Sequence, residues 1–367
     1  MNAKTCFALG TWRLVVPRPV HALRVALIAL VLVTMSMPWH APRVARANGA
    51  FVVNSSADTA TMDNFLTLRE AIQVANGTLH GPFSSAEAAQ LGGCVFEDGY
   101  IIGGCGGFVF DDITFASSVT QINLTSYLPA LTDAGTWING SAGVPRIDAG
   151  GMSLTGNVFT VSGNDITISN LSIVNGDPSG VYADIWVASG KDARIAYNYL
   201  GTVPGATNCS PSGVTRNSAN GVYVAPNSSG GSGANNGVAY IYGNTIGCHS
   251  QDGIYVYGAD YVYIGVQADG NTPDGNYIGT NSGEVDLGNG RNGVSLQASD
   301  TDGVRSCVIQ RNMIVRNHGD GIQLTGTGYS NDGSTSNNQI RSNLVFLNSQ
   351  SGIRLTYGAY ANFVLRG

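Results

Sequence analysis

The stretch Asn312–Leu324 reads N-M-I-V-R-N-H-G-D-G-I-Q-L and sets the frame of the chain. The frame returns at Asn244–Val256 and Asn343–Leu355, where an Asn precedes a short apolar pair and a Gly nine residues later opens an alternating strand. Two more copies, starting at Asn198 and Asn276, carry insertions before that Gly. The glycines are 32, 40, 28 and 31 residues apart: Gly221, Gly253, Gly293, Gly321 and Gly352. Self-similarity at such a period predicts a stacked repeat fold.

Residues 1–47 are a predicted signal peptide. Three arginines precede the apolar run Val25–Val33, and Ala45-Arg46-Ala47 fits a small-x-small cleavage site. The run is shorter than the roughly 20 apolar residues that a membrane span needs. We therefore expect a secreted or cell-surface protein with no transmembrane segment in the mature chain.

The charge balance limits the partners of the mature chain. Removing the leader leaves 12 Lys and Arg against 24 Asp and Glu, a formal net charge of −12. A nucleic-acid partner is not expected, because neutralising phosphates needs a basic face. An acidic polysaccharide would need a bridging cation or a local basic patch.

Short strands and tight turns are the expected elements. Charged residues make up 11% of the chain and Gly contributes 50 of 367 residues, which suits strands and turns better than helices. Three- to five-residue strand patterns follow one another without intervening helices, which favours a β-solenoid. They lie at 51–53, 112–115, 120–124, 136–139, 146–148, 158–161, 166–168 and 171–173.

Five cysteines remain after the leader. Cys94 and Cys105 share a Gly-rich segment and can pair. Cys209 and Cys248 become axial neighbours if coils stack in order, so a second bridge is plausible, while Cys307 occupies an inward strand position and is expected as a buried thiol. Sequence alone leaves the connectivity open.

One helix is expected, after Thr67. Thr67 and Glu70 have the spacing of a capping box, an apolar stripe follows, and Gly77 is a suitable terminator. The segment Phe65–Gly77, with the upstream Phe51–Asp58, resembles the N-terminal CSLREA domain of exported bacterial proteins. Leu66 stands where that family has its naming Cys, which excludes a disulfide from this position.

The resemblance implies an N-terminal cap on a right-handed parallel β-helix. An amphipathic helix laid across the first coil would shield its apolar face and its unpaired strand edge. Arg69 and Glu70 are then expected to anchor the cap by hydrogen bonds, since adjacent helix positions do not face each other as a catalytic pair would. The expected organisation is a signal peptide (1–47), a cap containing a long loop from His80 to Gly107 (48–107), and a parallel β-helix without a C-terminal cap (108–367).

The repeat also accounts for the most regular polar column. The Asn residues at the start of each frame are expected to form an inward ladder that satisfies backbone groups from coil to coil. No catalytic motif stands out, and neither a metal site nor a cofactor is expected, because Ca²⁺ has only fragments of a binding loop at 269–271 and 300–303. Weak catalytic candidates are His318, Asp320 and Arg316, and turn chemistry explains Asp320 equally well.

Outward tyrosines form the more plausible ligand surface. Tyr223 and Tyr255 share one strand position, and Tyr240 and Tyr263 share another. Aromatic rings on a flat solenoid face suit sugars, although tyrosines also pair across strands for structural reasons. The leading hypothesis is a non-catalytic adhesin-like or structural protein that binds polysaccharide or a cell-surface glycan along these tyrosines. The alternative is a polysaccharide lyase or glycoside hydrolase, a class that uses this fold, with its site between the insertions after Asn198 and Asn276.

Overall fold

The computed structural model describes residues 49–105, 110–140, 143–152, 155–215, 217–225, 239–267, 272, 274–328 and 333–365. The predicted signal peptide lies outside the described residues. The described residues all belong to one compact unit. Within them, no helix combines the length and the apolar character that crossing a bilayer requires.

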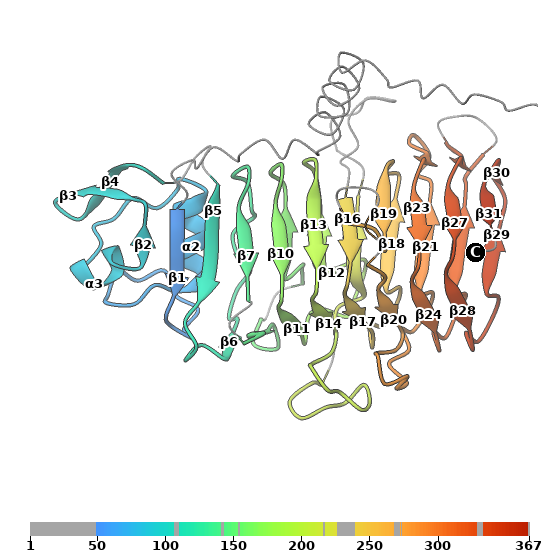
Figure 1. Ribbon diagram of the computed structural model, residues 1–367, viewed down its shortest axis with the longest axis horizontal. Coiled ribbons are helices and arrows are strands. Elements are labelled where there is room, and N and C mark those ends of the chain that lie inside the picture. Colours follow the sequence, from blue (N-terminus) through green and yellow to red (C-terminus); the bar gives the residue numbers. More distant parts are fainter. Residues whose placement is uncertain are drawn as a thin grey trace, which may run out of the picture. The chain divides into compact units, whose positions relative to one another are not determined.

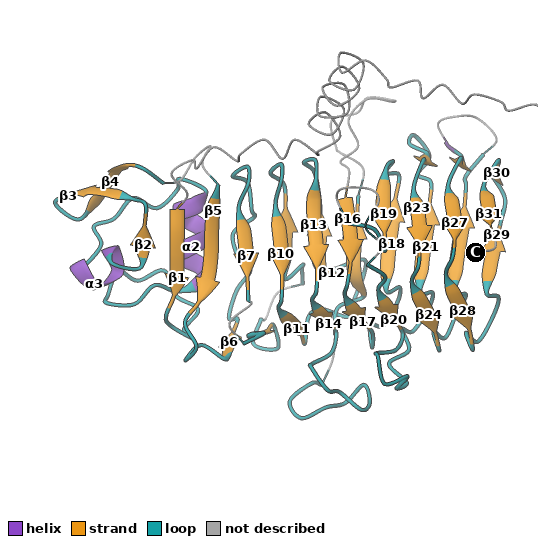
Figure 2. Ribbon diagram, viewed as in Figure 1, coloured by secondary structure: helices purple, strands orange, loops and turns teal. Residues whose placement is uncertain are grey.

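The fold is a right-handed parallel β-helix (Figure 1). It is a stacked repeat, as the period predicts, and of the kind that the resemblance implies. Each regular coil gives one strand to each of three parallel sheets, and helices are few (Figure 2). Sheet 1 has eleven strands in the spatial order β2 (Leu91–Gly92), β1 (Gly49–Val53), β5 (Asp111–Phe115), β7 (Trp137–Asn139), β10 (Thr167–Ser169), β13 (Ala193–Ala196), β16 (Ala239–Tyr242), β19 (Val262–Ile264), β23 (Val308–Gln310), β27 (Gln339–Arg341) and β31 (Phe363–Leu365).

Sheets 2 and 3 complete the coils. Sheet 2 has eight strands: β6 (Gln121–Asn123), β8 (Arg146–Asp148), β11 (Ser172–Val174), β14 (Tyr199–Leu200), β17 (Thr245–Ile246), β20 (Tyr277–Ile278), β24 (Met313–Val315) and β28 (Leu344–Phe346). Sheet 3 has seven: β9 (Phe159–Val161), β12 (Ala183–Val187), β15 (Asn220–Val224), β18 (Ile254–Tyr257), β21 (Val294–Gln297), β25 (Ile322–Thr325) and β29 (Ile353–Leu355). In the last coils, the connection from sheet 3 to sheet 1 contains a further three-stranded sheet. Its strands are β22 (Val304–Arg305), β26 (Thr335–Ser336) and β30 (Ala359–Tyr360).

In-register stacking of like residues builds the core. Parallel pairing places one isoleucine per coil in a single buried column of sheet 1: Ile113, Ile138, Ile168, Ile195, Ile241, Ile264, Ile309 and Ile340. Full burial of each such side chain is worth about 1.5–3 kcal/mol. Because the same position recurs in every coil, the repeat in the sequence becomes a continuous core.

The predicted asparagine ladder is confirmed at the corner between sheets 1 and 2. Asn244 Oδ1 accepts the backbone N–H of Asn198 at 2.9 Å, and Asn276 Oδ1 accepts that of Asn244 at 3.0 Å. Asn312 and Asn343 continue the series. The residue before the ladder Asn often has a positive φ, for example 58° at both Tyr197 and Arg311, so this corner turns through the left-handed region.

A second ladder lies at the corner between sheets 2 and 3. Asn289, Asn317 and Asn348 are linked in the same way, and His249 takes the place before Asn289 by donating its backbone N–H to Asn289 Oδ1 at 3.2 Å. A further ladder lies on the same side, in which the side-chain oxygen of each residue accepts the backbone N–H of the next. Its members are Asn220, Asp252, Asn292, Asp320 and Ser351. These ladders satisfy backbone groups that the short strands leave unpaired.

The expected helix is α2 (Leu68–Ala75), with Thr67 as N-cap and a complete capping box to Glu70. Burial raises the pKa of Glu70. Arg69 bonds Asp58 Oδ1 at 2.7 Å and the carbonyl oxygens of Ser126 and Tyr127, so it fastens the helix to the first coils as expected.

The segment from His80 to Gly107 is not the plain loop that its composition suggests. Its described residues contain α3 (Ser85–Ala88), strand β2, and the antiparallel pair β3 (Val95–Glu97) and β4 (Tyr100–Gly103). Elements of two to four residues are too short to show a period in sequence. The two pairings that the sequence allowed are present, Cys94–Cys105 and Cys209–Cys248, and Cys307 is a buried free thiol.

Candidate functional site

An open groove of about 810 Å³ follows the corner between sheets 1 and 2. Three successive coils contribute equivalent residues around the ladder asparagines: 274–277, 311–313 and 342–344. We call this the corner groove. It crosses several coils, so a linear polymer could lie in it along the stacking direction.

A phenol and a carboxylate meet at one end of the corner groove. Tyr197 donates a short hydrogen bond to Asp274 Oδ2, and Gln267 Nε2 lies 3.3 Å from the same oxygen and 3.2 Å from the Tyr197 hydroxyl. Burial, with the hydrogen bond to Asp274, raises the pKa of Tyr197 to about 12. The ring of Tyr197 packs against Gly243, where a Cβ would lie 2.6 Å from it. This hydroxyl is therefore a proton donor to Asp274 at neutral pH.

Arg311 lies in the middle of the same groove and is exposed. Six other arginines of the described part form ion pairs with aspartates: Arg69, Arg146, Arg194, Arg291, Arg305 and Arg354. The guanidinium of Arg311 makes no hydrogen bond or ion pair to any residue in the described ranges. It is available to a ligand anion.

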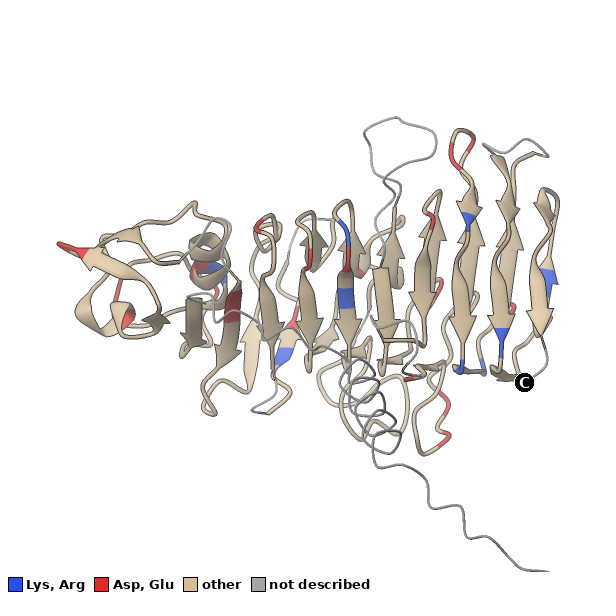
Figure 3. Ribbon diagram, turned by 45° about the horizontal axis from the view of Figure 1, so that its top comes forward, with Lys and Arg blue, Asp and Glu red and all other residues tan. Residues whose placement is uncertain are grey.

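The charge of the mature chain is divided unevenly along the stack. Residues 48–287 contain five Lys and Arg against twenty Asp and Glu, whereas residues 288–367 contain seven against four. Lys and Arg recur on the coils close to the C-terminal end (Figure 3). The coils after residue 287, which carry the excess of positive charge, supply two of the three segments that line the corner groove.

The structure places the three weak catalytic candidates at the opposite corner of sheet 2. Asp320 is buried, its Oδ1 accepts the backbone N–H of Ser351 at 2.8 Å, and its Oδ2 lies 3.7 Å from Arg354. His318 is exposed and has no bond to Asp320 or Arg316 among the described residues. Asp320 thus serves the ladder, and the three side chains do not form one acid–base group.

The four predicted tyrosines lie on two sheets instead of one face. Tyr223 and Tyr255 stack on sheet 3 with ring centroids 5.1 Å apart, and Trp186 extends this stack at 6.3 Å. Tyr240 and Tyr263 stack on sheet 1 at 5.0 Å. Near-parallel rings cover one another's faces, so a sugar would meet ring edges and hydroxyls, except at the ends of the stacks. Carbohydrate binding here stays a prediction, on a narrower surface than the sequence suggested.

A buried histidine–aspartate pair was missed by sequence reasoning. His249 Nε2 lies 3.0 Å from Asp184 Oδ2, Nδ1 lies 3.0 Å from Asn289 Oδ1, and the side chains of His249 and Asp184 are fully buried. The ring occupies space that Gly201 and Gly221 leave, because a Cβ on either would lie within 3.0 Å of it. The pair crosses 65 residues of sequence, so no local pattern indicates it.

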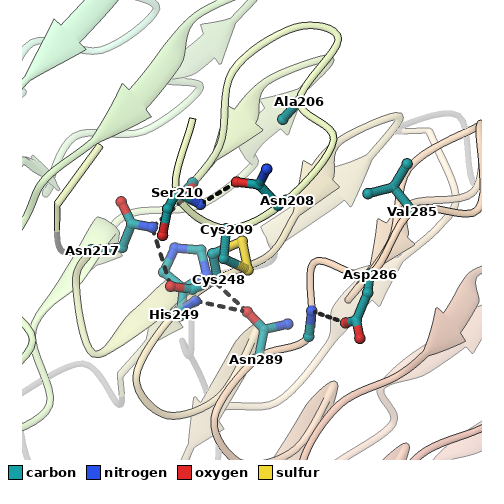
Figure 4. Close-up of a disulfide and its surroundings, with 12 residues drawn as sticks. Ala206, Asn208, Cys209, Ser210, Asn217, Cys248, His249, Val285, Asp286 and Asn289 are labelled. Carbon is teal, nitrogen blue, oxygen red and sulfur yellow. Dashed lines mark hydrogen bonds between the residues drawn. A yellow bond between two sulfur atoms is a disulfide. The ribbon is translucent and has the colours of Figure 1, made fainter. Parts of the chain in front are cut away.

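Both ring nitrogens of His249 face acceptors. Asn289 Oδ1 already accepts a backbone N–H, which fixes its orientation, so Nδ1 is a donor toward it. Nε2 faces a carboxylate oxygen of Asp184. Figure 4 shows His249 next to the Cys209–Cys248 disulfide and Asn289.

The two insertions meet on the same side as His249. Asn281 Nδ2 in the second insertion bonds the carbonyl oxygen of Ala206 in the first at 2.9 Å, and the disulfide of Cys209 to Cys248 fastens the first. The corner groove lies along the other edge of sheet 2. In the described ranges, no cluster of three or more His, Cys, Asp or Glu side chains has a geometry that could hold a metal ion.

Comparison with known proteins gives structural neighbours only. No family model and no curated protein matches the chain. The A-module of the Azotobacter vinelandii mannuronan C-5 epimerase AlgE4 matches with a TM-score of 0.45 and 13% identity, covering 71% of this chain and 59% of that one. A mutant of the periplasmic alginate epimerase AlgG matches with a TM-score of 0.30 and 10% identity, covering 76% and 66%.

Both neighbours are by title enzymes that act on a polysaccharide. This finding corrects the leading hypothesis from the sequence, a non-catalytic adhesin-like or structural protein, which we do not retain. The absence of a matching family model leaves the CSLREA resemblance a prediction. The neighbours share the parallel β-helix and assign no residue of this chain.

Proposed function

We propose that this protein is an exported enzyme that binds an acidic polysaccharide in the corner groove and modifies it by proton transfer. The observation that carries the proposal is that one groove is lined by Asp274 and by Arg311, whose guanidinium has no partner among the described residues. The activity is of the kind named in the titles of the two neighbours, but the proposal rests on the groove. The two disulfides agree with an oxidising compartment.

The chemistry follows from the two charges. Arg311 would bind the carboxylate of a sugar unit and neutralise it, which makes the adjacent C–H more acidic. Asp274 would accept that proton, while Tyr197 and Gln267 hold its Oδ2. Returning a proton to the opposite face of the carbanion gives the epimer. Expelling the neighbouring glycosidic oxygen, which takes up a proton, gives chain cleavage with an unsaturated end.

Hydrolysis fits the groove less well. Glycoside hydrolases generally place two carboxyl groups about 5–10 Å apart on either side of the scissile bond. Asp274 is the one carboxylate among the described residues that line the corner groove. Of the two enzyme classes in the alternative hypothesis, a lyase is therefore better supported than a hydrolase.

The test is to incubate residues 48–367 with alginate, polygalacturonate and a neutral glucan in D₂O. Proton NMR of the polymer reports deuterium incorporation and epimerisation, and ultraviolet absorbance reports unsaturated ends. We expect turnover of an acidic polymer, and a loss of about 100-fold or more in Asp274→Asn, the size typical of a general base. Asp286→Asn is the matched control, since Asp286 is exposed on the second insertion.

Two outcomes would contradict the proposal. One is that none of the three polymers exchanges or changes. The other is turnover that is equal in wild type and Asp274→Asn, which would place the reaction elsewhere on the protein.

A further inference from the structure

A second arginine that makes no ion pair with any described carboxylate, Arg316, stands across sheet 2 from the corner groove. Arg316 and Arg311 flank β24, at most about 17 Å apart along the chain. The Nη1 atom of Arg316 is buried and has no hydrogen-bond acceptor in the described part of the molecule. A buried, unpaired donor of a charged group is costly and calls for an anion.

The position of Arg316 is fixed by its neighbour in the second ladder. Asn317 donates to Asn348 Oδ1 from Nδ2 at 2.9 Å, and its own Oδ1 accepts from Asn289 Nδ2 at 2.8 Å. Arg316 itself has a positive φ of 60°, as at the other corner. With Asn317 held inward, Arg316 and the exposed His318 are the side chains on either side of a rigid turn.

The pair is particular to this coil. In the second ladder, the residues that take the place of Arg316 in the other coils are Cys248, Gly288 and Leu347. Those that take the place of His318 are Ser250, Gly290 and Ser349. None of those residues is charged, so the architecture of the turn does not require a cation here. The exposed His318 and the guanidinium of Arg316 also have no partner among the described residues.

The surroundings connect Arg316 to the corner groove. The carbonyl oxygen of Arg316 lies 2.2 Å from where a Cβ on Gly288 would be, so the turn is packed on the base of the second insertion. Between Arg311 and Arg316, the outward residue Met313 belongs to the corner groove. An anionic chain leaving the groove across sheet 2 would reach Arg316.

We propose that Arg316 and His318 form a second anion subsite, which holds a carboxylate of the polysaccharide at a sugar unit remote from the one that reacts. This rests on the proposed function for the identity of the ligand. Arg316 would give charge-assisted hydrogen bonds to the carboxylate, and His318 would add a further donor. The subsite anchors the chain and takes no part in proton transfer.

The test is a titration of residues 48–367, with disulfides intact, against an oligogalacturonate, a neutral malto-oligosaccharide and sodium sulfate. Calorimetry gives affinities and NMR follows the His318 ring signals. We expect the oligogalacturonate, and not the malto-oligosaccharide, to shift the His318 ring signals. We expect Arg316→Gln to weaken oligogalacturonate binding about ten- to a hundredfold, the loss of one charge-assisted contact. Lys191→Gln, which removes an exposed positive charge on another coil, should leave binding unchanged.

The outcomes separate the subsite from the proposed reaction. Unchanged affinity in Arg316→Gln, with His318 signals unmoved, overturns the subsite even if Asp274-dependent turnover is found. Sulfate bound through Arg316 without any competition from the oligogalacturonate also overturns it. Arg316-dependent binding of the oligogalacturonate supports the subsite even if no polymer is turned over, in which case the proposed reaction alone fails.

Discussion

Replacing Asn276 by Ala removes one rung of the ladder between sheets 1 and 2. The Asn276 side chain makes four hydrogen bonds: its Nδ2 donates to Ile241 O and Asn312 Oδ1 at 2.8 Å each, and its Oδ1 accepts from Asn244 N at 3.0 Å and Asn244 Nδ2 at 2.9 Å. The residue is 1% exposed, so water cannot replace these partners.

The size of the effect follows from the group that is left behind. Asn276→Ala leaves one buried backbone group without a partner, the N–H of Asn244, because the C=O of Ile241 still accepts the N–H of Gly265 at 2.8 Å. An unsatisfied buried group costs about 1–3 kcal/mol, so the free energy of unfolding should fall by about this amount. The total for a typical domain is about 5–15 kcal/mol.

Urea unfolding followed by circular dichroism measures the change. Asn208→Ala is the control, because exposed Asn208 makes one local bond, to Ser210 N at 2.8 Å, and surface changes usually stay within about 0.5 kcal/mol. Asn276→Asp should be destabilising as well, since it turns an acceptor toward the Ile241 carbonyl. If Asn276→Ala unfolds at the same urea concentration as wild type, the ladder does not stabilise the coils and the reasoning fails.

Two further predictions concern the other buried groups. His249→Ala should lower the free energy of unfolding by about 3–5 kcal/mol, because it leaves Asp184 buried and unpaired. The double variant His249→Ala/Asp184→Ala should recover part of that loss. An equal loss in the single and double variants, measured by urea unfolding, would rule out the pairing. Burial raises the pKa of Tyr223 to about 12 and also raises that of Tyr255, above the ordinary value of 10. The folded chain therefore keeps protons that the unfolded chain releases, so stability is level below pH 10 and falls as pH rises toward 12. Phenolate absorbance together with Tm should show this slope, and Tyr223→Phe/Tyr255→Phe should flatten it; an unchanged slope in that variant would contradict the assignment.

The regular features of the fold could be predicted because each repeats. The Asn column, the core isoleucines and the Gly that opens each strand recur at one period, and parallel in-register stacking brings equal positions together. The same rule predicts the Cys209–Cys248 bridge, since coils that follow one another in sequence also lie next to each other in space. The short elements between His80 and Cys105 were not predicted, because they have no period.

Only part of the candidate site could be predicted from the sequence. Sequence singled out Arg316 and His318 as weak catalytic candidates, and both stand in the proposed second subsite. The grouping with Asp320 was not found, since the backbone turns Asp320 inward to the ladder. The contact of Tyr197 with Asp274 spans 77 residues across an insertion of irregular length, and nothing in the spacing indicates it.

By itself, the sequence of this protein determined the stacked repeat and its N-terminal helix, because a strict repeat and a capping box act locally or between adjacent coils. It left the cysteine pairing open, and the structure decided it. Only the tertiary structure decided what Asn312–Leu324 contributes to a site. The corner at Asn312 belongs to a groove and the corner at Asn317 to a charged turn, because the winding of the coil sends residues only five positions apart to opposite edges of one sheet. Which side chains then lack partners depends on what the neighbouring coils place beside them, and no single repeat carries that information.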